Sequence, residues 1–331
     1  MSTLSTSIIG FLVCAGLITL SGTQLSKQGN RLAELTGLSK AWIGLILMAT
    51  VTSLPELVTG LSSVVVVKAP DLAVGNVVGS CTFNLLILSL LDLMLKKPIT
   101  SLVKTSHVVA GSFSIILLAC VLVAILLAPQ TPAILWVSPF SLLLIAIYLV
   151  AMRGIFLFET SNVLVEGEES ISEDSVKNGL RRVLSIYSVH ALIVTIAALF
   201  LPYFGEKIAQ QTGLSDSFFG TVFLAITTSL PELVVSVSAL RMGSLDMAMG
   251  NLLGSNVFNI AILSLLDFFY TEGPLYAEIS GTHSLSILAS IIMTAVVAIG
   301  LVTRPERKTW RLGVDSWFIL IIYVLLLMIL N

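Results

Sequence analysis

Long apolar stretches alternate with short polar breaks along the whole chain. Each stretch has about the 20 residues that an α-helix needs to cross the hydrocarbon core of a bilayer. The pattern predicts an all-α polytopic membrane protein with ten transmembrane helices. These helices are expected near residues 5–23, 41–65, 71–95, 106–128, 133–153, 183–204, 217–240, 246–270, 283–302 and 314–330.

The composition agrees with this pattern. Of the 331 residues, 56% are hydrophobic and only 11% are charged, whereas a soluble domain has about a quarter of charged residues. This excludes a soluble enzyme. The net charge of -2 comes with no basic cluster that would indicate nucleic acid. Cys14, Cys81 and Cys120 lie in apolar stretches and fit neither a disulfide framework nor a zinc site.

The chain contains an internal repeat, offset by 175 to 176 residues. Residues 49–58 (ATVTSLPELV) match residues 225–234 (AITTSLPELV) at eight of ten positions. Residues 75–92 (GNVVGSCTFNLLILSLLD) match residues 250–267 (GNLLGSNVFNIAILSLLD) at twelve of eighteen. Because each copy contains five stretches, an odd number, the second copy is expected to be inverted in the membrane.

This repeat predicts three segments: a first five-helix repeat (1–158), an acidic linker (159–178) and a second, inverted five-helix repeat (179–331). With ten spans, all Lys and Arg except Lys68 and Lys207 fall on the side opposite the termini. Positively charged short loops stay in the cytoplasm. We therefore expect a cytoplasmic linker, both termini external or periplasmic, and a multi-pass protein of the cell (inner or plasma) membrane.

Two acidic residues, Glu56 and Glu232, lie near the middle of predicted helices at matching positions of the repeat. Ionisable groups at membrane depth are costly and mark ion or substrate pathways. A Thr and a Ser precede each Glu by four and three residues, which places their oxygens on the same helix face. These are Thr52, Ser53, Thr228 and Ser229. Pro55 and Pro231 each lack an N–H, so a backbone carbonyl nearby is left free.

The second repeated motif adds further neutral oxygens. Ser80 and Asn84, like Ser255 and Asn259, are four residues apart and can face the Glu-bearing helices. The motif's glycines permit close helix approach. Hard cations such as Ca²⁺ take six to eight oxygen ligands. Two ionised Glu are neutralised by one divalent or two monovalent cations. A carrier that reorients readily only when its site is loaded acts as an antiporter.

Other repeated polar residues are expected to have different tasks. Asn76 and Asn251, nearer the helix starts, fit capping or bonds between helices at least as well as ion contact. Asp92 and Asp267 lie eight residues beyond the asparagines, about 12 Å along a helix, and are expected to be charges at helix ends. The repeated histidines, His107 and His283, receive no role.

The paired TSLPE and GN-x-x-GS-x-x-FN motifs resemble the alpha repeats of the cation/calcium exchanger superfamily, in its sodium/calcium exchanger branch. The resemblance implies ten helices in two inverted halves, exchange of sodium for calcium by alternating access, and a gate formed by the first and sixth helices. It also implies a set of ion ligands. They are Ala49 (carbonyl), Thr52, Ser53, Glu56, Ser80, Asn84, Ala225 (carbonyl), Thr228, Ser229, Glu232, Ser255 and Asn259.

The sequence departs from this family at Asn259, where members of the branch often carry Asp. The alternative of a calcium/proton or potassium-linked exchanger with the same fold therefore remains open, and a passive cation channel is a more distant one. An intramembrane hydrolase is disfavoured, because the chain has neither an HExxH nor a GxSxG motif. The expected partners are calcium and sodium ions and the lipid bilayer, with no cofactor, nucleic acid or protein partner.

Overall fold

The protein is described by a computed structural model covering residues 3–161, 173–212 and 224–330. Within these ranges the chain forms helices joined by turns, and the only β-structure there is two isolated bridges. The helices of the first half are α1 (Thr3–Thr36), α2 (Lys40–Ile43), η1 (Gly44–Met48), α3 (Ala49–Thr52), α4 (Leu54–Ser62), η2 (Ser63–Val67), α5 (Pro70–Asp92), α6 (Ile99–Leu102), α7 (His107–Leu127), η3 (Ala128–Gln130) and α8 (Pro139–Ser161). Those of the second are α9 (Glu173–Thr212), α11 (Leu224–Thr228), α12 (Leu230–Arg241), α13 (Leu245–Phe269), η5 (Leu275–Ala277), α14 (His283–Thr303) and α15 (Val314–Leu330).

Eight helical segments of the described chain are long and apolar enough to cross a membrane, and α2 to η2 form one of them, Lys40–Val67. Helix α15 is apolar but shorter, with 17 residues. The span predicted at 217–240 corresponds to α11 and α12, and its first residues, 217–223, lie outside the described ranges. The prediction of a multi-pass helical membrane protein is confirmed, whereas the count of ten inverted spans stays a prediction.

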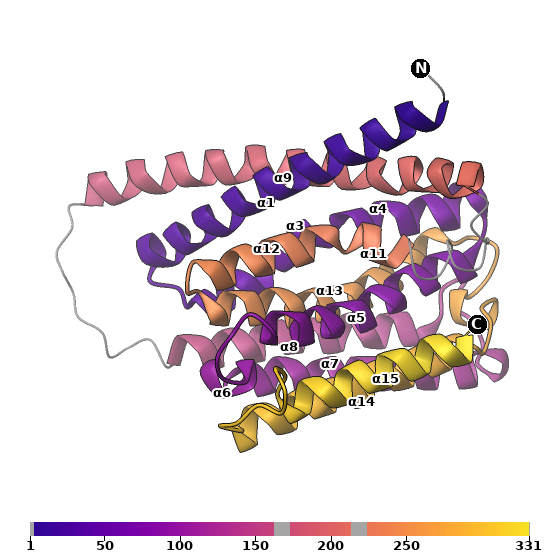
Figure 1. Cartoon of the computed structure of the whole chain (residues 1–331). Helices are drawn as coiled ribbons and strands as arrows, with labels where there is room; N and C mark the ends of the chain where they lie inside the picture. The colour runs from indigo at the N-terminus through magenta and orange to yellow at the C-terminus, as the bar shows by residue number, and fades with distance from the viewer. Residues whose placement is uncertain (1–2, 162–172, 213–223, 331) are drawn as a thin grey trace.

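Helices α1 and α9 are much longer than predicted, because the pattern placed spans only at 5–23 and 183–204. Beyond its apolar run, α1 continues through polar residues that include no proline. The two helices pack against each other along one face of the molecule, and α1 also packs on α12 (Figure 1). Hydropathy locates the apolar part of such a helix but not its polar extension.

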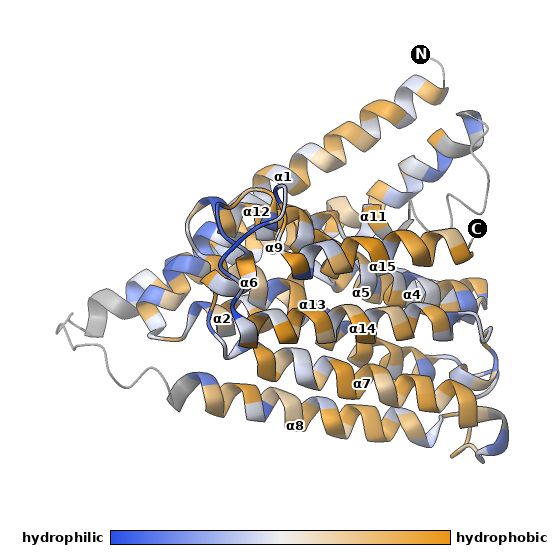
Figure 2. Ribbon diagram, turned by 60° about the horizontal axis from the view of Figure 1, so that its bottom comes forward, coloured by the Kyte–Doolittle hydropathy of each residue, from blue (hydrophilic) through white to orange (hydrophobic). Residues whose placement is uncertain are grey.

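Helices α5 and α13, which carry the GN motifs, form the centre of the fold. They pack against each other, and most of their residues are buried. The surrounding helices α7, α8, α14 and α15 consist largely of hydrophobic residues, as Figure 2 shows. Leu20, Leu149 and Met328 are examples of large exposed apolar side chains. A chain with apolar side chains both inside and outside is suited to a lipid environment.

Two glycines of α13 allow the backbone of the Glu56-bearing segment to approach closely. A Cβ atom added at Gly254 would lie 2.3 Å from the carbonyl oxygen of Leu45, and one at Gly250 would lie 2.5 Å from that of Ala41. The facing Gly44 is equally tight, with the carbonyl oxygen of Met247 at 2.3 Å. The predicted close approach is therefore confirmed for the second GN motif.

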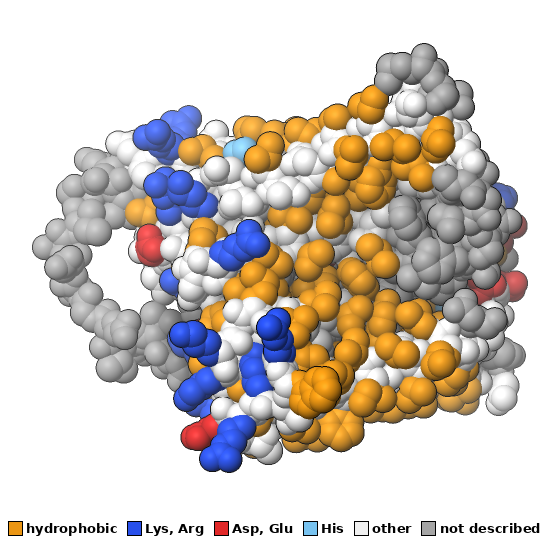
Figure 3. Space-filling model, viewed as in Figure 1, with side chains coloured by type: hydrophobic (Ala, Val, Ile, Leu, Met, Phe, Trp, Pro, Cys, Tyr) orange, Lys and Arg blue, Asp and Glu red, His pale blue; other side chains and the backbone are white. Residues whose placement is uncertain are grey.

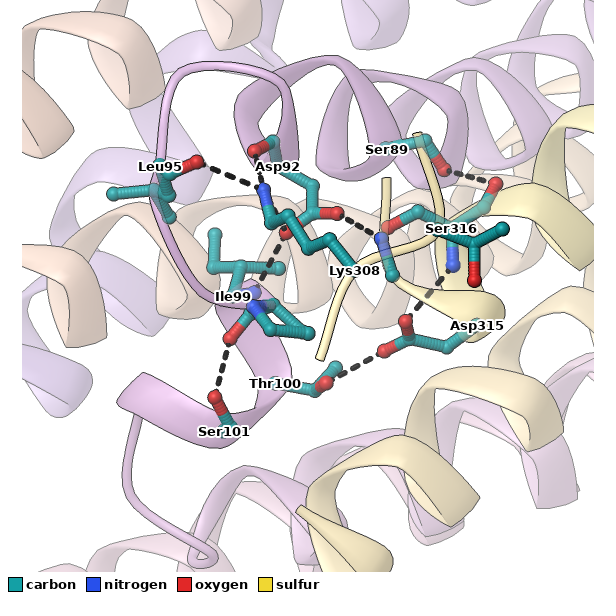
Figure 4. A network of polar contacts seen from close by, with 12 residues as sticks. Ser89, Asp92, Leu95, Ile99, Thr100, Ser101, Lys308, Asp315 and Ser316 are labelled. Carbon is teal, nitrogen blue, oxygen red and sulfur yellow. Dashed lines mark hydrogen bonds and ion pairs between the residues drawn. The ribbon is translucent and has the colours of Figure 1, made fainter. Parts of the chain in front are cut away.

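Asp92 ends α5 and ties it to the start of α6 and to the distant turn between α14 and α15 (Figure 4). Its carboxylate accepts hydrogen bonds from the N–H groups of Ile99 (2.8 Å) and Gly313 (2.7 Å). It also forms a buried ion pair with Lys308, whose Nζ lies 3.2 Å from Oδ1. Lys308 donates to the carbonyl of Leu95 as well. This arrangement fixes the turn between α14 and α15 to the end of α5.

Asp267, the repeat counterpart of Asp92, ties the end of α13 to two neighbouring segments through hydrogen bonds from neutral donors. Its carboxylate accepts hydrogen bonds from the N–H groups of Leu275 (2.6 Å) and Ser138 (2.8 Å) and from the hydroxyl of Ser141 (2.6 Å). The predicted position of both Asp residues at helix ends is confirmed, and both side chains are fully buried.

The two repeated histidines pair with aspartates of the opposite half. His107 Nε2 lies 3.1 Å from Asp246 Oδ1, and His283 Nε2 lies 2.9 Å from Asp71 Oδ1. Asp71 and Asp246 are themselves repeat counterparts in the first turns of α5 and α13. Each pair joins the start of one central helix to the start of α7 or α14, which is a structural role that the sequence did not reveal.

Charge is distributed unevenly along the molecule. Figure 3 shows Lys and Arg side chains gathered at one end, with hydrophobic side chains covering the length beside them. Helix α1 begins and α15 ends at the other end (Figure 1). This separation agrees with the predicted sorting of the basic residues.

Candidate functional site

The two glutamates lie at matching helix breaks in the core. Helix α3 ends before Ser53 and α4 begins after it, and Ser229 separates α11 from α12 in the same way. At both serines ψ is close to zero, 4° and 10°. Pro55 follows two residues later, as in the second copy, and a proline cannot donate the helical hydrogen bond that would continue the preceding turn. Glu56 and Glu232 therefore lie in the first turns of new helices and are fully buried.

Each carboxylate is held by a serine from the other half of the chain. Ser53 donates a hydrogen bond to Glu232 Oε1 (3.2 Å), and Ser229 donates to Glu56 Oε1 (3.4 Å). Ser80 of α5 adds a third bond, to Glu56 Oε1 at 3.1 Å. The two breaks thus face each other, and residues from both repeats form one cluster.

The two threonines connect these breaks to the central helices. Thr52 donates to Asn251 Oδ1 (3.3 Å), and its hydroxyl lies 3.4 Å from that of Ser255. In the matching contacts, Thr228 donates to Asn76 Oδ1 (3.2 Å), and its hydroxyl lies 3.5 Å from that of Ser80. Of the roles that the sequence left open for Asn76 and Asn251, the structure shows bonds between helices.

Several buried polar atoms in this cluster have no hydrogen-bond partner, and they fall in matching pairs. The second carboxylate oxygens, Glu56 Oε2 and Glu232 Oε2, are unpaired, and so are Asn84 Oδ1 and Asn259 Oδ1. The Nδ2 atom of Asn259 is unpaired too. Most buried polar atoms in proteins are satisfied, so four unpaired oxygens in symmetric positions indicate a place for a ligand that oxygen atoms bind.

The two carboxylates have no positively charged partner among the residues that the structure describes. None of the ion pairs in the described part of the chain includes Glu56 or Glu232. An unpaired ionised carboxylate in a dry interior is strongly unfavourable, so these groups require a cation or a proton. Carboxylate, hydroxyl and amide oxygens are the donors that hard cations prefer. Among the described residues no cluster of three or more His, Cys, Asp or Glu could hold a metal ion.

The structure also shows one residue of this region that the sequence did not single out. Asn256 accepts a hydrogen bond from Asn84 Nδ2 (3.0 Å) and donates to the carbonyl of Cys81 (3.2 Å). This contact directs the Asn84 side chain and leaves its oxygen unpaired. Asn256 occupies the position that Cys81 has in the other repeat. A polar residue in an otherwise apolar helix, where the other repeat has an apolar residue, was the sequence signal that could have identified it.

The remaining predicted residues lie in or beside the cluster. The carbonyl of Ala49 accepts the N–H of Ser53 (3.0 Å) and the hydroxyl of Thr52 (3.4 Å). Ala225 lies in α11, before Thr228. Ser255 and Asn259 lie on α13 and are fully buried.

The fold and this cluster define a multi-pass membrane protein whose core holds two carboxylates among neutral oxygen donors. The sequence pattern of the family described as "Sodium/calcium exchanger protein" matches residues 6–157 and 183–330. The chain belongs to this family, and its membership supports cation exchange rather than enzymatic catalysis.

Individual relatives and a solved structure agree with this assignment. The sodium/calcium exchanger MaX1 of Methanosarcina acetivorans is 36% identical over 129 residues, which cover 37% of this chain and 36% of MaX1. The match thus spans about a third of that relative. The inner membrane protein YrbG of Escherichia coli is 28% identical over 291 residues, or 86% of this chain and 85% of YrbG. A structure of the sodium-calcium exchanger NCX_Mj, soaked with 10 mM Na⁺ and no Ca²⁺, superposes with a TM-score of 0.76. That structure covers 99% of this chain and 100% of its own at 21% identity, so it establishes the shared fold.

Proposed function

We propose that this protein exchanges sodium for calcium across a membrane by alternating access at the Glu56 and Glu232 site. The observation that carries the proposal is the matched pair of buried carboxylates, each with one unpaired oxygen and with no ion pair to any described residue. Calcium and sodium bind oxygen donors of this kind. The proposed ligands are the twelve residues named from the resemblance, with Ala49 and Ala225 contributing carbonyl oxygens.

Charge balance explains why such a site exchanges ions. One Ca²⁺ or two Na⁺ neutralise two carboxylates, whereas the empty site keeps two uncompensated charges. Moving uncompensated charges through a low-dielectric interior is costly. The loaded forms therefore change their accessibility more readily than the empty form, which couples the outward passage of one ion to the inward passage of the other.

The proposal includes an arrangement in the membrane. The repeats 1–158 and 179–331 would be inverted halves joined by the cytoplasmic linker 159–178, with the termini on the external or periplasmic side. The separation of the Lys- and Arg-rich end from the end where α1 begins supports this orientation through the positive-inside rule (Figures 1 and 3).

A flux assay tests the site. Purified protein in proteoliposomes should take up Ca²⁺ when Na⁺ is trapped inside, and Glu56→Gln and Glu232→Gln should each abolish this uptake. Glu272→Gln is the matched control, because Glu272 is exposed and pairs with the surface residue Lys68. Full uptake in either site variant would contradict the proposed site.

Imposed gradients of different ions separate the alternatives. Sodium-driven uptake supports the proposed exchange, whereas uptake driven by a K⁺ or proton gradient without Na⁺ supports a potassium-linked or calcium/proton exchanger. These alternatives stay open because both Asn84 and Asn259 carry an amide, so that the site has only the two carboxylates of Glu56 and Glu232. Calcium entry without any counter-ion would instead indicate a channel.

A further inference from the structure

The turn between α14 and α15 is held in a fixed shape with its tip fully exposed. Thr309 and Leu312 form a β-bridge, and Trp317 Nε1 donates to the carbonyl of Thr309 (2.9 Å). Lys308 fastens the turn to the end of α5 through Asp92. Trp310, at the tip, has a positive φ of 62° and is 90% exposed. A bulky residue rarely adopts this backbone conformation, so the surrounding contacts hold the side chain outward.

The side chains around this tip form two shallow hollows. One, of about 480 Å³, is lined by Leu93, Trp310, Arg311, Leu312 and Trp317. The other, of about 340 Å³, is lined by Thr309, Trp310 and Trp317. The walls are aromatic and aliphatic, with one guanidinium at the edge. Such a surface suits a molecule that has both an apolar part and an anionic group.

Basic residues predominate beside the hollows, since residues 304–313 contain four Lys and Arg residues and one acidic residue, Glu306. Arg307 and Arg311 on the turn are exposed, and so are Lys96 and Lys97, which directly follow Leu95. Leu95 accepts a hydrogen bond from Lys308 (3.0 Å), so this segment lies against the turn. Figure 3 shows the basic side chains at this end of the molecule next to hydrophobic ones.

The repeat contains a second turn of the same shape without the charge. Ile134 and Val137 form the matching bridge, and Leu135 at its tip has a φ of 61° and is 84% exposed. Trp136 donates to the carbonyl of Phe268 (3.0 Å) and occupies the position of Arg311. Residues 128–138 contain no Lys or Arg. Both turns share the apolar tip, but only the turn at the basic end has cations.

We propose that the turn between α14 and α15 binds the phosphate of an anionic phospholipid from the leaflet at the basic end. Tryptophan is favoured at the boundary between acyl chains and headgroups, where Trp310 would lie. Arg307 and Arg311 would contact the phosphate, which guanidinium groups bind in a bidentate manner. Charge complementarity selects this occupant, because the uncharged turn at Leu135 has the same shape but no group that recognises an anion. The proposal does not depend on which ions the protein exchanges.

Brominated lipids test the proposal in nanodiscs that contain the full chain. The signal is the difference in tryptophan emission between the unaltered protein and Trp310→Phe, which removes the contribution of the other tryptophans. Brominated phosphatidylglycerol should quench this emission at a several-fold lower mole fraction than brominated phosphatidylcholine. Removing one basic contact should weaken the preference about five-fold, which corresponds to 1 kcal/mol for each charge near an anionic surface.

Charge variants decide whether the site is specific. Arg307→Gln and Arg311→Gln together should remove the preference for phosphatidylglycerol. Arg241→Gln is the matched control, because Arg241 is an exposed base at the end of α12 and not part of the turn. Equal quenching by both lipids, or an equal loss in Arg241→Gln, would overturn the proposal. Protection of Trp310 from both lipids, together with a dimer on cross-linking, would show instead that a second copy covers the turn.

Discussion

Replacing Asp92 by Asn should destabilise the protein strongly, because it leaves Lys308 partly buried without its counter-ion. The Asp92 side chain is fully buried, and that of Lys308 is 10% exposed. Removing one partner of a buried ion pair typically costs about 3–5 kcal/mol. We expect the lower part of this range, about 3 kcal/mol, because Lys308 also donates to backbone carbonyls of Asp92 and Leu95 that remain in the variant.

A double-mutant cycle isolates the ion pair from the other bonds of Asp92. Asp92→Asn, Lys308→Met and the double variant are compared by equilibrium unfolding in mixed micelles with increasing dodecyl sulfate. The loss in the double variant should be smaller than the sum of the single losses by about 2 kcal/mol, because a removed charge no longer leaves the other one unpaired. Asp267→Asn is the matched control for Asp92→Asn, because Asp267 accepts hydrogen bonds from neutral donors and its replacement leaves no unpaired cation. Additivity within about 0.5 kcal/mol would refute the reasoning.

Two further predictions concern the site and its packing. Asn259→Asp should add a third carboxylate, so that one Ca²⁺ no longer balances the site; the charge moved per cycle should change, and calcium flux in proteoliposomes should depend differently on an imposed membrane potential. An unchanged voltage dependence would count against the charge-balance argument. Gly254→Ala should destabilise the fold by about 1–3 kcal/mol, because the new Cβ would lie 2.3 Å from a backbone oxygen. Gly16→Ala meets no atom within 4 Å, so in the same unfolding assay it should be neutral or stabilising.

The sequence pointed to the parts of the candidate site that depend on local chemistry. A carboxylate in a membrane helix is costly wherever it occurs, and a proline breaks a helix wherever it occurs. Glu56 and Pro55 could therefore be interpreted without a structure. The expected helix-end position of Asp92 followed from its distance along α5. The predicted spans 106–128 and 283–302 agree closely with α7 and α14, because in these helices the apolar run and the helix have nearly the same ends.

The sequence could not predict contacts between distant segments. Ser53 was placed beside Glu56 because both lie on one helix, but its hydroxyl binds Glu232, 179 residues away. His107 received no role because its partner Asp246 is 139 residues away. The polar half of α1 was missed for another reason. A helix that continues beyond its apolar run is stabilised by packing, here against α9, and a hydropathy pattern does not contain that information.

The repeat separates the contacts that the two halves share from those in which they differ. Serine to glutamate, threonine to asparagine and histidine to aspartate contacts occur twice, each time between residues of opposite halves. A substitution in one half therefore changes the surroundings of the other half's carboxylate. The differences lie where the two copies face different surroundings. Lys308 and Arg311 belong to the turn at the basic end, and the matching turn near Leu135 has no charge. The two halves thus share a nearly symmetric cluster of carboxylates and oxygen donors, and they differ in the charge of the turns at their helix ends.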